Sequence, residues 1–342
     1  MGMPEIVPPT PSSTLEYYPP LPKPAGPPPQ QRYWLHLLLL LATGFTTLVV
    51  GARLEFNFLN NLPAFRAGNE IIPYFPIGWA LAHPSRLLLG IPFSLSLLLI
   101  LLSHEMGHYL FCRLYGVYAT LPYFIPAPTL IGTLGAVIRI KAPIRSRKAL
   151  FDIGIAGPIA GFVVAVVTLV IAIFLSKPIG RGVGASELQL GLPAVFDLVQ
   201  GFVRHVTPGR AAAVLPMSRI YLHPVAVAAW VGMYATALNL LPSGQLDGGH
   251  IVYALAPRAH RLVSWMTVLA LVALATKAYR HDHENSSWWL WAGILTVMNV
   301  LSFRLEQAPE HPLLPRSRWV LALIAAIMLA LTFKGSPFRM AS

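Results

Sequence analysis

The pentapeptide HEMGH, residues 104–108, combines two histidines and a glutamate in a pattern that can carry out metal chemistry. In a helix of 3.6 residues per turn, His104 and His108 lie one above the other on one face, so both imidazoles can bind a single metal ion. Glu105 follows the first histidine and can take a proton from a water molecule at that metal. Zinc in such a site lowers the pKa of water and polarises a carbonyl group, which is the chemistry of amide hydrolysis.

The surroundings of this motif are apolar, since it lies within LLSHEMGHYLFC, residues 101–112. A charged side chain at the centre of a membrane helix costs about 2.5 to 3.5 kcal/mol, so a buried Glu105 needs compensation. A bound metal ion provides that compensation. The alternative is that the three polar residues line a path for protons or ions.

Two histidines leave a tetrahedral zinc short of one protein ligand, with the fourth position open for water. The chain has four aspartates, which are Asp152, Asp197, Asp247 and Asp282. Asp197 and Asp282 fall in segments that we expect on the outward side of the membrane, whereas the histidines are expected towards the cytosolic side, as argued below from the basic residues. Asp152 is better explained as an interfacial ion pair or a helix N-terminal charge. Asp247 remains, in NLLPSGQLDGG, where proline and glycines break an apolar segment as irregular backbone does when it lines a cavity.

The composition shows which class of protein must hold these residues. Of 342 residues, 55% are hydrophobic and 11% are charged, whereas a soluble domain carries about 25% charged residues. We therefore expect an all-α polytopic membrane protein with about six to seven transmembrane helices, each of about 20 residues. The expected spans are residues 33–51, 87–112, 150–175, 222–242, 262–279, 287–303 and 318–333.

Basic residues set the expected orientation. The net charge of +12 forms no aromatic-interleaved face, so no nucleic-acid partner is expected. Basic residues near span ends stay on the cytosolic side, and the densest basic cluster is RIKAPIRSRK, residues 139–148. This loop and the active site are therefore placed towards the cytosol, in a bacterial inner membrane, with an organelle membrane as the alternative. The segment 177–220 then faces outwards and is too short for an independent domain of about 50 residues, so a cap or partial helix is expected there.

Taken together, HEMGH, FDIGIAGPIAGF and NLLPSGQLDGG resemble the site-2 protease family of intramembrane zinc metalloproteases, over about residues 87–257. The resemblance implies one zinc ion per chain held by His104, His108 and Asp247, with Glu105 as general base. It also implies that Asn239 helps to position the substrate or the oxyanion. The expected function is an endopeptidase that cuts transmembrane segments of protein substrates within the lipid bilayer. The segment 177–220 is too short for a PDZ domain, so the chain is similar to the compact branch of the family.

Four segments are expected along the chain: a disordered Pro-rich cytosolic arm (1–32), a first transmembrane helix with an outward loop (33–86), a catalytic membrane core (87–257) and additional C-terminal transmembrane helices (258–342). Two rival functions use the same residues. One is a metal-ion or proton transporter, and the other is a non-catalytic scaffold of the same family. The second rival is disfavoured because the glutamate and all three expected ligands are present.

Two further patterns concern positioning. PTLIGTLGAVIRI, residues 128–140, is too short to span as a helix and is rich in β-branched residues. It predicts a re-entrant strand or hairpin beside the site, onto which an unwound substrate could add as a strand; an amphipathic loop or half-helix is the alternative. In GIAGPIAG, Gly157 and Gly161 lie four residues apart, a spacing that favours close helix packing rather than chemistry.

Overall fold

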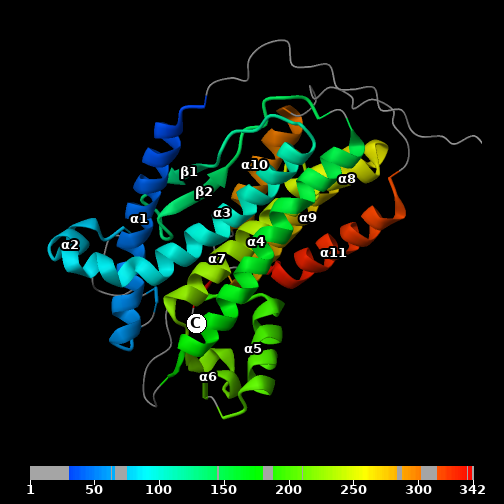
Figure 1. Ribbon diagram of the computed structural model, residues 1–342. Helices are drawn as coiled ribbons and strands as arrows, with labels where there is room; N and C mark the ends of the chain where they lie inside the picture. Colours follow the sequence, from blue (N-terminus) through cyan, green and yellow to red (C-terminus); the bar gives the residue numbers. More distant parts are fainter. Residues whose placement is uncertain are drawn as a thin grey trace, which may run out of the picture. The chain divides into compact units, whose positions relative to one another are not determined.

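The computed structural model describes residues 31–62, 64–65, 75–144, 146–179, 188–209, 211–282, 287–301, 314–336 and 338–340. These residues form mostly helices, with a few short strands (Figure 1). The Pro-rich arm up to residue 30 lies outside the described residues. So do residues 66–74 of the expected outward loop and Arg145 of the basic loop.

Four helices in the described part of the chain are long and apolar enough to cross a membrane. They are α1 (Tyr33–Leu59), the continuous stretch of the 3-10 helix η1 (Pro84–Gly90) and α3 (Ile91–Leu114), α4 (Arg147–Leu175), and α9 (Pro257–Asp282). The described residues are thus largely helical, with four membrane-spanning candidates, fewer than the six to seven spans expected from hydropathy.

The other expected spans correspond to shorter helices. These are α7 (Pro224–Asn239), α10 (Ser287–Leu301) and α11 (Arg316–Thr332), of 16, 15 and 17 residues. Each is shorter than the roughly 20 residues that cross a hydrocarbon core. The expected span 222–242 ends early at Asn239 because Pro242 has no amide hydrogen and disfavours helical backbone in the residue before it.

The remaining elements are short. The helices are α2 (Ile77–Leu81), α5 (Ala194–Val206), α6 (Ala211–Val214), the 3-10 turn η2 (Met217–Arg219) and α8 (Asp247–Leu255). The strands are β1 (Tyr123–Pro126), β2 (Thr133–Val137), β3 (Lys177–Pro178), β4 (Leu188–Leu190), β5 (Ile220–Tyr221) and β6 (Phe338–Met340). They pair antiparallel as β1 with β2, β3 with β5, and β4 with β6.

Helix α3 lies at the centre of the packing, against α4 and α7. Its residues Phe93, Leu97 and Ile100, at positions i, i+4 and i+7, are at most 1% exposed. Helix α4, which packs against α3, also carries apolar side chains on its exposed face, where Val163 and Val167 are each 54% exposed. A helix that is apolar on both its packed and its exposed faces suits a lipid rather than an aqueous solvent.

The hairpin of β1 and β2 is attached to helix α1. Its register pairs Tyr123 with Val137 and Pro126 with Thr133. The Thr46 hydroxyl on α1 donates to the carbonyl of Gly132 in the turn, at 2.6 Å, and His36 Nδ1 lies 3.1 Å from the carbonyl of Pro122 just before β1. The sequence pattern at 128–140 located β2 and the turn but missed β1, whose YFIP segment ends in a proline.

Asp152, near the start of α4, forms an ion pair with Arg318 of α11. Arg318 Nη2 and Nε lie 2.9 Å and 3.2 Å from the two carboxylate oxygens, and the Tyr115 hydroxyl donates to the same carboxylate. With both oxygens occupied in this way, Asp152 serves to join α3, α4 and α11.

Candidate metal centre

Helix α3 presents His104 and His108 on one face, as their spacing requires. Both side chains are buried, at 6% and 7% exposure, and their Nε2 atoms are 3.2 Å apart. The imidazole rings meet edge to face, with centroids 5.0 Å apart. Two ring nitrogens thus converge on one point inside the apolar packing.

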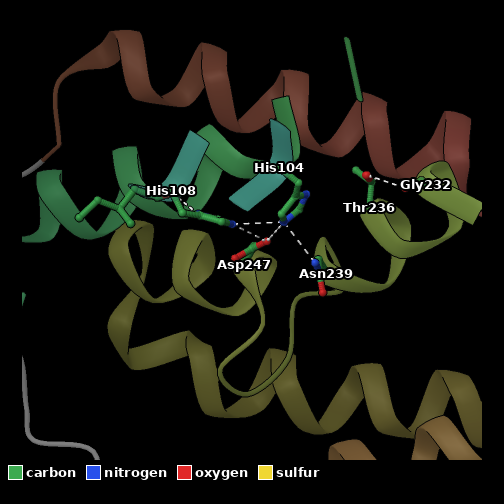
Figure 2. Close-up of polar contacts among 7 residues, drawn as sticks. His104, His108, Gly232, Thr236, Asn239 and Asp247 are labelled. Carbon is green, nitrogen blue, oxygen red and sulfur yellow. Dashed lines mark hydrogen bonds and ion pairs between the residues drawn. The ribbon is translucent and has the colours of Figure 1, made fainter. Parts of the chain in front are cut away.

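Asp247 joins this pair from far along the chain. It is the first residue of α8, and its Oδ2 lies 3.2 Å from His104 Nε2 and 3.3 Å from His108 Nε2. Figure 2 shows the two histidines of α3 pointing towards the aspartate, which approaches from the loop that follows α7. Among the described residues, these three form a cluster positioned to bind a metal ion.

The three atoms fit a tetrahedral zinc ion. Zn–N and Zn–O bonds of about 2.0 to 2.1 Å at tetrahedral angles place ligand atoms about 3.3 to 3.4 Å apart, and the observed separations are 3.2 to 3.3 Å. The buried Oδ2 of Asp247 accepts no hydrogen bond from the described residues. This is the condition expected of a metal ligand, because neither imidazole has an N–H to donate when both Nε2 lone pairs face an ion.

A backbone carbonyl orients the second histidine. His108 Nδ1 lies 2.7 Å from the carbonyl of Ile153 on α4. The Nδ1–H donates to this carbonyl, which leaves Nε2 as the atom with a free lone pair. Helix α4 therefore selects the tautomer that can bind a metal.

Two glycines of α4 make room for the imidazoles. A Cβ atom on Gly157 would lie 2.1 Å from His108 Nε2, and one on Gly161 would lie 3.0 Å from His104 Cβ. The expectation of close packing from GIAGPIAG is thus met by an unexpected partner, namely the histidine rings themselves. The spacing of small residues signals a close approach but cannot name the side chains that fill the space.

Glu105 and Asn239 flank the cluster from different elements. Glu105 is 8% exposed, and its carboxylate hydrogen-bonds to the backbone of Ile138, directly after β2. Asn239 is the last residue of α7, and its Nδ2 lies 3.2 Å from His104 Nε2 (Figure 2). One turn earlier on α7, the Thr236 hydroxyl donates to the carbonyl of Gly232 at 2.9 Å. Glu105 and Asn239, both expected at the site from the sequence, therefore lie next to the metal cluster, and the chain just after β2 passes beside Glu105.

Comparison with known proteins agrees with this geometry. The model of peptidase family M50 matches residues 92–275. The protein named "Probable zinc metalloprotease EGY1, chloroplastic" is 34% identical in Oryza sativa over 233 residues, covering 66% of this chain and 38% of that protein. Its Arabidopsis thaliana counterpart is 33% identical over 235 residues, with 66% and 40% coverage.

A third relative extends the match further along the chain. "Probable zinc metalloprotease EGY2, chloroplastic" of Arabidopsis thaliana is 28% identical over 281 residues, covering 80% of this chain and 45% of that protein. The matches thus span less than half the length of these curated relatives. The family model covers more than half of this chain and includes both polar motifs of the cluster. The chain therefore belongs to peptidase family M50, the site-2 protease family.

Proposed function

We propose that this chain is an intramembrane zinc endopeptidase that hydrolyses peptide bonds within or near the transmembrane segments of other proteins. One observation carries the proposal. Three potential ligands from two distant motifs converge within apolar helices, next to a buried glutamate. His104, His108 and Asp247 would hold the zinc ion, which, when bound, supplies a Lewis acid that lowers the pKa of water and polarises the substrate carbonyl.

Glu105 carries out both proton transfers, and Asn239 stabilises charge by hydrogen bonding. Glu105 takes a proton from the attacking water as the new C–O bond forms, then delivers it to the leaving amine as the C–N bond breaks. The side-chain amide of Asn239 donates a hydrogen bond to the developing oxyanion or to the substrate backbone. Its Nδ2, 3.2 Å from His104 Nε2, is close enough to the cluster to reach a carbonyl bound there.

The hairpin supplies a means of holding an unwound substrate. A peptide bond within a helix is shielded by its own hydrogen bonds, so the substrate must be extended locally. We propose that the hairpin of β1 and β2 is re-entrant and that the substrate adds to β2 as a further strand. The contact between Ile138 and Glu105 supports this role, because a strand placed there passes the general base.

We further propose that the chain spans its membrane six or seven times and that the site lies on the side of the basic loop 139–148. The sequence favours the cytosolic side of a bacterial inner membrane. The chloroplastic relatives make an organelle membrane the alternative, with the site again on the side of the basic loop.

Two single substitutions test the reaction. Glu105→Gln should keep zinc and lose cleavage of a transmembrane substrate, because the amide cannot accept the proton. Asp247→Ala should lose both zinc and cleavage, because it removes a ligand. Asp197→Ala, an exposed aspartate on α5, is the matched control and should behave like the parent.

The measurements are zinc content of the purified full chain and the appearance of new peptide termini. Cleavage by Glu105→Gln at the parent rate would refute the mechanism. A transporter would instead move metal or protons across vesicles and produce no new termini. A scaffold would bind its partner and leave it uncut in the parent as well as in both variants.

A further inference from the structure

The loop between Asn239 and Asp247 controls the relative placement of two of the proposed site residues. It runs through LLPSGQL, residues 240–246, and Ser243 within it is fully buried. Gly244 has a φ of +57°, in the left-handed region that glycine tolerates best. A loop of this shape has few regular backbone hydrogen bonds of its own, so other elements must satisfy its polar groups.

Helix α9 provides most of these partners from one face. His260, Ser264 and Thr267 follow the i, i+4, i+7 spacing of a single helical stripe. His260 Nε2 lies 3.3 Å from the Gly244 carbonyl, the Gly244 N–H donates to Ser264 Oγ at 3.3 Å, and the Thr267 hydroxyl donates to the Pro242 carbonyl at 3.3 Å.

Helix α10 adds one partner, Asn299. The Ser243 hydroxyl lies 3.3 Å from Asn299 Oδ1 and 3.4 Å from the Ser264 carbonyl. Asn299 is 7% exposed and Ser264 is 3% exposed, so water cannot replace these contacts cheaply. Asn299 also lies beyond residue 275, where the match to the family model ends.

We propose that Ser264 and Asn299 are positioning residues for the metal centre, and that the α9 stripe and α10 hold the 240–246 loop so that Asp247 and Asn239 face the histidines together. The inference rests on the proposed function only for the role of Asn239. For Asp247 it concerns the affinity of the chain for zinc. Each contact is made to the loop rather than to a ligand side chain, so these residues act through the loop.

The chain offers a matched pair of threonines on α9 for the test. Thr267 and Thr276 both donate to the carbonyl four residues earlier, at 3.0 Å and 2.8 Å. Of the two, only Thr267 also donates to a loop carbonyl within the described part of the chain. Thr267→Val and Thr276→Val therefore lose the same intrahelical bond and differ in the contact with the loop.

The experiment measures the zinc dissociation constant of the purified full chain by competition with a chelator, together with kcat and KM. Ser264→Ala and Asn299→Leu should weaken zinc binding about ten-fold, the lower end of the loss that follows removal of a group bonded directly to a ligand, because they act through the loop. They should also lower kcat with little change in KM, because the hairpin is untouched. Thr267→Val should shift both quantities in the same direction by a smaller factor, and Thr276→Val should match the parent.

Two outcomes would overturn the inference. One is parent-like zinc affinity in both Ser264→Ala and Asn299→Leu. The other is a loss of zinc affinity in Thr276→Val as large as that in Thr267→Val, which would show a general loosening of α9. Repeating the zinc titrations in a Glu105→Gln background keeps this test separate from proteolysis. If that background cuts substrate, the proposed function fails while the titrations still decide whether the loop is positioned as inferred.

Discussion

At the scale of single residues, the metal cluster depends on groups that are not ligands. The carbonyl of Ile153 orients His108, and the missing side chain of Gly157 leaves space for the same ring. Both come from α4, so the helix that packs against α3 also determines the geometry of the imidazoles. Outer partners of this kind commonly change metal affinity 10-fold to 100-fold when they are removed.

Gly157→Ala should therefore abolish stoichiometric zinc binding, because its Cβ would lie 2.1 Å from His108 Nε2. Overpacking of this kind also costs about 1 to 3 kcal/mol of stability. Gly161→Ala, one turn further on the same helix, should be milder, because its Cβ would lie 3.0 Å from His104 Cβ. Zinc per chain and thermal unfolding in detergent measure both effects. Full zinc occupancy in Gly157→Ala would show that the two helices can separate without disturbing the site.

Asn239→Ala should lower kcat about 100-fold, the usual effect of removing one oxyanion donor, while zinc content stays at the parent value. The expectation follows from the position of its Nδ2, 3.2 Å from His104 Nε2. Steady-state kinetics and metal analysis on the same preparation check it. Unchanged kcat with weaker zinc binding would instead make Asn239 a support for His104.

At the scale of elements, the hairpin and the metal cluster are held by different helices. Helix α4 and the 240–246 loop surround the cluster. The hairpin is instead hydrogen-bonded to α1 at two places, the Gly132 carbonyl in its turn and the Pro122 carbonyl just before β1. The two parts meet at Glu105 and Ile138. Damage to the hairpin should accordingly affect substrate handling without affecting the metal.

Gly132→Ala and Gly135→Ala separate these effects. Both residues have positive φ, +80° and +102°, so both substitutions carry a backbone cost of roughly 1 to 2 kcal/mol. A Cβ on Gly132 would also lie 2.7 Å from the Thr46 carbonyl of α1, whereas one on Gly135 would meet open space. We expect Gly132→Ala to lower kcat/KM more than Gly135→Ala, with full zinc in both. Equal losses in the two variants would mean that attachment of the turn to α1 is not required.

At the scale of the whole molecule, the proposed orientation rests on the basic loop and the length of α4. This helix has 29 residues and is about 43 Å long at 1.5 Å per residue, which exceeds the roughly 30 Å hydrocarbon core. Lys148, at the end of the basic loop, lies near the start of α4, and α5 follows the end of α4. The basic loop and α5 should therefore lie on opposite sides of the membrane.

Cysteine labelling in sealed vesicles tests this orientation. The single native cysteine, Cys112, is fully buried, so the parent chain should label weakly. Lys148→Cys and Arg204→Cys, both at exposed positions, should react with a membrane-impermeant maleimide from opposite sides. Only one of them should label before the vesicles are opened. Labelling of both from the same side would overturn the proposed topology and the side assigned to the site.

Much of the site could be predicted from the sequence because its strongest signals are local. The HEMGH spacing depends only on helical periodicity. Hydropathy located the four long helices, although α1 runs to Leu59, well beyond the expected end at residue 51. The length of α7 was overestimated, since an apolar run does not show where a proline ends the helix. Strand β1 was missed because a short segment with a proline carries little strand signal.

The sequence by itself determined that two imidazoles share a helix face inside an apolar segment, because i and i+4 contacts arise within one helix. Only the tertiary structure decided that the Asp247 carboxylate, already expected as the third ligand, lies within 3.3 Å of both imidazoles. It also decided that Gly157 faces His108 and that Ser264 and Asn299 contact the loop between Asn239 and Asp247. These relationships join elements distant in the chain. They depend on how helices pack rather than on the period of any one of them.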